Sequence, residues 1–503
     1  MQSHTHRATA IAIVITLVAS IGCTTKFNPA VDQFNGGNCD KAVNTAHSIA
    51  PTKKVPDRGS MARAEHDRDH LWVTLEKARM LNCCGEHDES MTMFYYVKGE
   101  SEFYRDIESR YKTNPLDLGS WDASQFAGDA GQAIMGADQL PYEVQPFEMI
   151  LCNAYGALNC LVLEEPGAAE FSRAAGNLQD DEGKDLAALG YLDNMPSPST
   201  KIDTAVRAAL PPNSSSNYST NMVFSLGDFT RVKSELKGAI DAGRAARAAD
   251  PRVAFASAVG WAAFYRDGDR SSQDASIRAM ELMSAAPNLA RAMRRIYDGD
   301  RSDFVLVLVD AGRGPKRSYF NVAFPIIIPK VGSAYFRAVY PALQFRPEGR
   351  PTSISVTGEG DPVDAEILTS IDAIAARDFR RREAALWWTP TIRAAIRVIG
   401  AIVAQAADRD KEGWGAIVGV ATAVMAVAEQ PDLRNWSTLP GSQHAAIVKR
   451  PANGMVQVRL SSASESEALT VSVPEGSSVV HVCAQTPRIT TVHAGALKPT
   501  GRD

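Results

Sequence analysis

The hydrophobic pattern changes along the chain, from helical spacing in the first part to short apolar runs in the last. Trp72, Leu75 and Leu81 recur at helical spacing, and so do the apolar residues of 147–161. Each stripe covers one face, as in helices that stack in an all-α layer. We therefore expect short paired helices from about residue 35 to residue 295.

The segment 147–161 also carries a row of small side chains on the flank of its stripe. Cys152, Gly156 and Cys160 are spaced i, i+4, i+8, which would let another helix approach closely. The two thiols are expected to fill core space rather than to perform chemistry. They lie ~12 Å apart along one helix, so they are not expected to form a disulfide with each other.

One segment of the helical part has the layout of a tetratricopeptide (TPR) repeat. Asp250-Pro251 predicts a helix start, with Asp as the N-cap and Pro in the first turn. The residues that follow, up to Asn288, have the order helix, Asp/Gly turn, helix and Pro. The Trp and Gly of the repeat's first helix are out of register, so we predict TPR-like helical pairs. A Pro/Ser/Asn-rich stretch at 195–221 predicts a loop.

From Phe304 onward the pattern favours strands. FVLVLVDAG, a Gly/Pro turn and SYFNVAFPIIIP predict two strands joined by a turn. Asp361-Pro362 predicts the start of a helix with Ile367 on its inner face. The segment 414–428 predicts a helix that is apolar on all sides, and its length falls short of the ~20 residues that cross a bilayer. We expect it to be buried.

Short strands account for much of the remaining C-terminal sequence, with turns at Asn453-Gly454 and Pro474–Gly476. The predicted strands are Ala338–Leu343, Ser353–Val356, Ala445–Lys449, Met455–Leu460, Ala468–Val473 and Ser478–Ala484. The predicted fold class is therefore α+β, mainly α. We expect a TPR-like helical-pair domain at 23–300 and a smaller α/β domain at 301–503, with buried helices and a C-terminal β layer.

Composition and charge narrow the class of protein. The chain has 503 residues, of which 45% are hydrophobic and 22% charged, and its formal net charge is −5. These values exclude a disordered chain, a polytopic membrane protein and a basic nucleic-acid binder. The chain is longer than a typical domain with a single hydrophobic core, so we expect more than one domain.

Residues 1–22 have the pattern of a secretory signal peptide, with Arg7 before an uncharged apolar stretch. Ser20-Ile21-Gly22-Cys23 resembles the lipobox of bacterial lipoproteins, although Ser20 stands where that pattern prefers Leu. The resemblance implies that Cys23 is lipidated and becomes the first mature residue, and that Thr24, not being Asp, directs the protein to the outer membrane. A plain secretory signal and an uncleaved anchor helix are the alternatives.

Export would expose the remaining cysteines to an oxidising compartment, where some of them could pair. Their number leaves too many pairings for the sequence to assign. The cysteines after Cys23 are Cys39, Cys83, Cys84, Cys152, Cys160 and Cys483.

Residue types that bind metal cluster at one place in the helical part. His66 and His70 are spaced i, i+4 on a possible helix, and Cys83, Cys84 and His87 follow. We place the Cys-Cys-x-x-His stretch beyond the end of that helix, and adjacent cysteines chelate one ion poorly. The histidines are thus weak metal candidates, and we expect solvated histidines, half-buried thiols and no cofactor.

The sequence contains no G-x-S-x-G elbow, H-E-x-x-H or other compact catalytic signature. We therefore do not predict an enzyme. A hydrolase whose site is assembled from distant residues stays an alternative.

Several segments together resemble a family of bacterial outer-membrane-type lipoproteins with a TPR-like helical half, whose molecular function is not established. The clearest is LPYEVQPFEMILCNAYGALNC, followed by VLVDAGRGPKR and DLRNWSTLPG. The residues that carry the resemblance are Pro141, Tyr142, Glu143, Glu148, Tyr155, Ala157, Leu158, Asn159, Asp432, Arg434, Trp436, Leu439 and Pro440.

The resemblance implies a lipid-anchored periplasmic protein of the cell envelope, and we expect a non-enzymatic scaffold or protein-binding module. Its partners would be the membrane, through Cys23, and other envelope proteins or lipoproteins. A pore or assembly accessory acting through the 414–428 helix is the alternative. The candidate recognition residues could equally form an inter-helix hydrogen-bond network and a domain-joining turn. They are Tyr142, Glu143, Glu148, Tyr155, Asn159, Arg434 and Trp436.

Overall fold

The computed structural model describes the chain in ten pieces. They are residues 24–49, 61–111, 142, 144–185, 253–283, 285–328, 332–381, 433–462, 466–486 and 489–498. Cys23, Glu143, Asp250-Pro251 and the segments 195–221 and 414–428 lie outside these residues, so the predictions made for them stay predictions.

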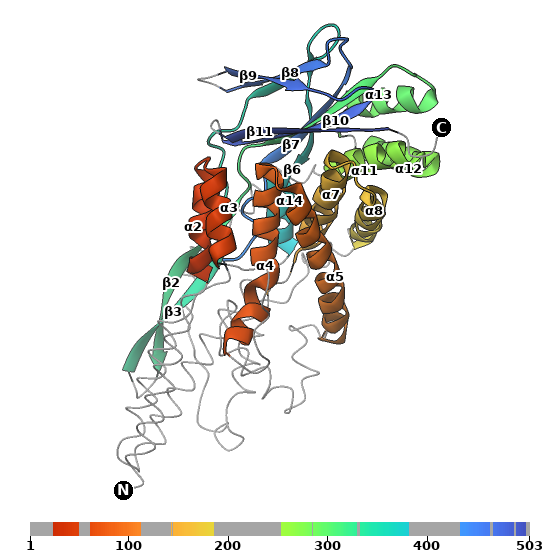
Figure 1. The fold of residues 1–503 in the computed structure, drawn as a ribbon. Coiled ribbons are helices and arrows are strands. Elements are labelled where there is room, and N and C mark those ends of the chain that lie inside the picture. Colours follow the sequence, from red (N-terminus) through yellow and green to blue (C-terminus); the bar gives the residue numbers. More distant parts are fainter. Residues whose placement is uncertain are drawn as a thin grey trace.

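Within the described residues, a region of paired helices is followed by mixed β-sheets, which confirms the predicted α+β class (Figure 1). The helices are α2 (Thr24–Asn35), α3 (Cys39–Ile49), α4 (Met61–Cys84), α5 (His87–Tyr111), α7 (Pro146–Val162), α8 (Ala168–Asp185), α11 (Ala254–Asp267), α12 (Arg270–Leu282), α13 (Pro287–Asp298) and α14 (Ile371–Arg381). The strands are β1 (Phe304–Ala311), β2 (Lys316–Ile328), β3 (Gly332–Gln344), β4 (Ser353–Thr357), β5 (Val363–Asp364), β6 (Glu366–Ser370), β7 (Ser442–Lys449), β8 (Met455–Ser461), β9 (Ser466–Ser472), β10 (Ser478–Thr486) and β11 (Ile489–Ala496).

The central element of the β part is a five-stranded sheet in the order β11-β10-β1-β7-β6. β1 pairs in parallel with β10 and antiparallel with β7. A second sheet, in the order β5-β4-β8-β9, covers one face of the first. Among the described strands, β2 and β3 pair only with each other, as a two-stranded ribbon. The predicted strands on either side of the Gly/Pro turn, β1 and β2, therefore belong to different sheets.

The five-stranded sheet lies between the helices and the second sheet, because alternate residues of each strand point to opposite faces. Leu306 and Leu308 of β1 join the helical core, whereas Val307 and Val309 pack with β4 and β8. All eight residues of β1 are buried. The main change from helices to strands lies near residue 300, and one hydrophobic core contains residues from both sides of it.

Helix α7 is the most enclosed helix of the described chain. The predicted apolar stripe is buried, but so are all residues from Phe147 to Leu161, so the expectation of a single buried face was wrong. The reason is that α5, α8 and α11 pack around α7 and the sheet covers its remaining side. Gly156 gives the predicted close approach, since a Cβ there would lie 2.6 Å from the Phe171 ring of α8.

Two sequence predictions about helix limits were wrong. The residues after Asp361-Pro362 form β5 and β6, and a helix begins only at Ile371, because Glu366–Ser370 pairs with β7. Ile367, expected on an inner helix face, is 58% exposed. Cys83 and Cys84 belong to the last turn of α4 instead of lying beyond it. Cys84 forms a disulfide with Cys39 of α3.

The paired-helix arrangement also includes α11 and α12. Gly268 ends α11 with a φ of 72°, and Asp269 caps α12 by accepting a hydrogen bond from the Ser272 amide. This is the Asp/Gly turn that the sequence predicted. Among the described helices, none is both long enough and apolar enough to cross a membrane.

Candidate functional site

Polar and charged side chains meet inside the molecule where α4 and α7 pack against the five-stranded sheet. Arg79, Tyr155, Asp310, His481 and Cys483 are all 0% exposed. We call this group the charged centre. Asp310 and Cys483 are register partners on β1 and β10, and His481 lies two residues before Cys483, on the same face of β10.

Arg79 and Asp310 form the main ion pair of the charged centre. Tyr155 Oη donates to Asp310 Oδ1 at 3.1 Å, and the Arg79 guanidinium lies over the Tyr155 ring, 4.2 Å from its centroid. The two Nη atoms of Arg79 are 3.6 and 3.7 Å from Cys483 Sγ. A single guanidinium from the helical region thus neutralises a carboxylate and faces a thiol of the sheet.

His481 and Cys483 form the other side of the charged centre, and the Cys83 thiol lies next to Cys483. His481 Nε2 is 2.8 Å from Asp310 Oδ2 and 3.6 Å from Cys483 Sγ. Burial alone would lower the pKa of His481, but Cys483 and Asp310 raise it to about 9. Burial alone would raise the pKa of Cys483, but hydrogen bonding from Cys83 and the positive charges of His481 and Arg79 hold it well below its usual range.

A neutral hydrogen-bond network extends from the charged centre toward α5. Asn159 Oδ1 accepts from Asn82 Nδ2 at 2.6 Å and lies 2.8 Å from His87 Nδ1, and Asn159 Nδ2 donates to Ser90 Oγ at 2.8 Å. Burial lowers the pKa of His87 to about 4, with a smaller contribution from neighbouring His493. His87 is therefore a buried neutral member of this network rather than the solvated residue we expected.

The loop 433–441 is fixed to the helices by buried carboxylates. Glu76 accepts bonds from the Ser437 amide (2.7 Å), the Ser437 hydroxyl (2.7 Å) and the Thr438 amide (3.0 Å). Glu148 accepts from the Tyr142 hydroxyl and the Trp436 amide. Burial raises the pKa of both carboxyls, against the lowering effect of these bonds.

Two further bonds connect the same loop to α4. Arg434 forms an ion pair with Asp69 at 2.9 Å, and Trp72 Nε1 donates to the Asn435 carbonyl at 3.0 Å. The loop therefore makes side-chain bonds to α4 and α7, which lie more than 270 residues earlier in the chain.

The six described residues of the expected recognition surface are all in this interior network. Their exposed fractions run from 0% to 3%, so a recognition surface was the wrong interpretation for them. The structure shows the alternative, an inter-helix network and a joining turn. The residues are Tyr142, Glu148, Tyr155, Asn159, Arg434 and Trp436.

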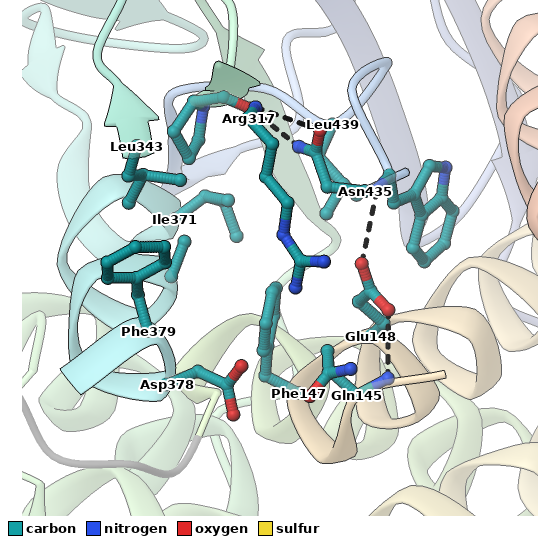
Figure 2. A pocket seen from close by; sticks show the side chains of 13 residues that line it. Gln145, Phe147, Glu148, Arg317, Leu343, Ile371, Asp378, Phe379, Asn435 and Leu439 are labelled. Atoms are coloured by element: carbon teal, nitrogen blue, oxygen red, sulfur yellow. Dashed lines mark hydrogen bonds between the residues drawn. The ribbon is translucent and has the colours of Figure 1, made fainter. Parts of the chain in front are cut away.

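A small hollow opens beside the 433–441 loop, and its empty space of about 400 Å³ includes open solvent. Figure 2 shows the Arg317 side chain reaching into it, with Phe147 below its guanidinium and Glu148 at the side. Most of its wall is apolar and comes from α7, α14 and the loop. The apolar wall includes Phe147, Leu343, Ile371, Ala375, Phe379, Trp436 and Leu439.

Within the described residues, one group has the residue types and spacing of a metal site, and it is not the cluster of weak candidates found in the sequence. Asp310, His481 and Cys483 place one ligand atom each within 4.8 Å of one another. Among the described side chains, neither His70 nor His87 belongs to such a group, and the side chain of His66 lies outside the description. His70 contacts the Tyr96 ring instead.

The charged centre is not arranged as a nucleophile with a base and an orienting acid. A relay of that kind uses both ring nitrogens of the histidine, whereas Asp310 and Cys483 both face His481 Nε2. His481 Nδ1 has no hydrogen-bond partner within the part of the chain that the structure describes. What this arrangement can do is hold charge, or an ion, inside the core.

No family model matches the chain, and comparison with curated proteins and with solved structures finds no match. The resemblance to lipoproteins therefore stays a prediction.

Proposed function

We propose that the protein is a lipid-anchored binding scaffold of the cell envelope, attached through Cys23, which binds an apolar segment of another envelope protein and carries out no reaction. The observation that carries this proposal is the hollow beside Trp436. It is open, mostly apolar and next to a rigid junction, which suits binding, whereas Asp310, His481 and Cys483 are sealed in the core.

The hollow has the features of a site for a peptide segment. Phe147 and Phe379, which are 9% and 5% exposed, supply the aromatic edges that an apolar side chain would meet. The Arg317 guanidinium has five N–H donors and can bond a backbone carbonyl of a partner while keeping other contacts. The bonds of Glu76 and Glu148 to the 433–441 loop hold this wall in place. Binding of a partner therefore costs little conformational entropy in the loop.

Photo-crosslinking in intact envelopes tests this proposal. A photoreactive amino acid replaces Ala375, which lines the hollow, or Ala373 of the same helix α14, which is the control outside it. We expect protein crosslinks from position 375 that are absent from position 373, and Phe147→Ala should reduce them. Crosslinks to lipid only, or the same products from both positions, would overturn the proposal.

Attachment through Cys23 has a separate test. Labelled palmitate should enter the wild-type chain and not the Cys23→Ala variant. Equal labelling of the two proteins would exclude a lipid at this position, while leaving the hollow as a binding site.

A further inference from the structure

Three potential metal ligands meet in the charged centre, and a second thiol lies next to them. Asp310, His481 and Cys483 place an oxygen, a nitrogen and a sulfur atom within 4.8 Å of one another. The Cys83 thiol, at the end of α4, neighbours Cys483 and lies outside this 4.8 Å group. We infer that Asp310, His481 and Cys483 bind one divalent cation with the ligand preferences of Zn²⁺, which takes sulfur, imidazole and carboxylate ligands, and that Cys83 moves in as the fourth ligand.

The spacing of the atoms is close to that of a tetrahedral zinc site. Cys483 Sγ and His481 Nε2 are 3.6 Å apart, and a sulfur and a nitrogen bound to tetrahedral zinc at their usual bond lengths stand ~3.6 Å apart. Asp310 Oδ2 is 2.8 Å from the same Nε2, which is a hydrogen-bond distance. This pair has to separate by about 0.5 Å when an ion replaces the shared proton.

The fold holds three of the ligands in place before any ion binds. β1 and β10 pair in register at Asp310 and Cys483, and the two-residue spacing puts His481 and Cys483 on one face of β10. Cys83 comes from the opposite layer, and its backbone carbonyl accepts from Thr491 of β11. The ion would therefore connect α4 to the sheet.

The charges of the charged centre favour a cation. Burial is complete for all four ligands, so unbalanced charge would be costly. One divalent ion and Arg79 supply three positive charges, which match the Asp310 carboxylate and two thiolates. Arg79, whose Nη atoms lie 3.6 and 3.7 Å from Cys483 Sγ, then acts as a donor to the ligands.

Complete burial also indicates what the ion does. A closed four-ligand zinc site is structural, since a catalytic site keeps a position open for water or substrate. Binding deprotonates the ligands and contributes directly to folding free energy. The inference is independent of the proposed binding function, because no ligand of this site lines the hollow.

The test starts from the full chain, purified without chelator or added reductant. Elemental analysis should find about one zinc per chain. After exchange for Co²⁺, a thiolate-to-cobalt charge-transfer band should appear in the near ultraviolet. Cys83→Ser should weaken this band, and Cys483→Ser should abolish it. The control is Cys152→Ser in α7, whose thiol bonds to the Phe94 carbonyl and should leave the band unchanged.

Three results would overturn the inference: no stoichiometric metal in a wild-type chain that is folded by circular dichroism, a band that survives in Cys483→Ser, or a Cys83–Cys483 disulfide in non-reducing peptide maps of the freshly purified protein. If Cys483→Ser fails to fold, the Cys83→Ser variant provides the test instead. A cobalt charge-transfer band of unchanged intensity in Cys83→Ser would show that Cys83 is not a ligand.

Discussion

Tyr155 of α7 donates a hydrogen bond to Asp310 of β1, with 3.1 Å between Tyr155 Oη and Asp310 Oδ1. The same hydroxyl accepts from Gln443 Nε2 of β7 at 2.8 Å, and the Arg79 guanidinium covers the Tyr155 ring. One side chain of the helical region therefore contacts two strands and the main buried ion pair. Apolar packing alone would allow α7 to slide on the sheet, whereas these bonds fix its position.

Asp310→Asn is expected to destabilise the fold strongly. The change removes the carboxylate that neutralises Arg79, which is 0% exposed, and an unpaired buried charge costs about 3–5 kcal/mol. Urea unfolding should show this loss in the free energy of unfolding. Glu170→Gln is the control, because Glu170 pairs with Lys98 at the surface and such pairs contribute about 0–1 kcal/mol. Equal losses in the two variants would contradict the role of Asp310.

Gly156→Ala should be destabilising, although Ala favours helix. A Cβ at Gly156 would lie 2.6 Å from the Phe171 ring, and overpacking of this kind costs about 1–3 kcal/mol. Gly176 of α8 has open space around its Cβ position, so Gly176→Ala should stabilise by about 0.5–1 kcal/mol. Thermal unfolding compares the two. Phe171→Leu should recover part of the loss in the Gly156→Ala background.

The Cys39–Cys84 disulfide should stabilise the packing of α3 on α4. It joins residues 45 positions apart, and removal of a native disulfide costs about 2–5 kcal/mol. The double variant Cys39→Ser, Cys84→Ser should unfold at a lower urea concentration than the wild type. A reducing agent should shift the unfolding midpoint of the wild type to the same urea concentration. A wild type insensitive to reductant would show that this bond does not form in solution.

His87 should make stability depend on pH between 6.5 and 4. Its pKa is lowered from 6.5 to about 4 because it is buried, so the neutral form favours the fold. This contribution is complete above pH 6.5 and is lost as the pH falls toward 4, by up to about 3 kcal/mol. His87→Gln should reduce that slope and leave the part due to His444, whose pKa burial also lowers to about 4. His47→Gln is the control, since the His47 side chain is 39% exposed.

Much of the fold could be predicted from local pattern. The helical stripe of α4 and the continuous apolar run of β1 were sufficient to predict these two elements, because both are long and bounded by polar turns. β11 was missed because ITTVHAGA lacks a strong apolar alternation, and it forms by pairing with β10. The helix predicted after Asp361-Pro362 failed because pairing of β6 with β7 overrides the local start signal.

The charged centre could not be predicted from the sequence, for a different reason. Arg79, Asp310 and His481 come from segments separated by more than 170 residues, and only the register of β1 with β10 brings the strand residues together. The sequence did contain a weak signal. Asp310 interrupts one apolar strand, and His481 and Cys483 interrupt another at a two-residue spacing, which places them on one face of that strand. Sequence alone gives such a residue no partner.

The central claim is that the helical region and the five-stranded sheet form one cooperative unit because buried bonds around Asp310 join them. Hydrogen exchange read by mass spectrometry, on peptides from α4, α7, β1 and β10, tests it in the wild type and in Asp310→Asn. We expect the same opening free energy in all four elements and a common loss of protection in the variant. Loss confined to β1 and β10, with α4 and α7 still protected, would contradict the claim.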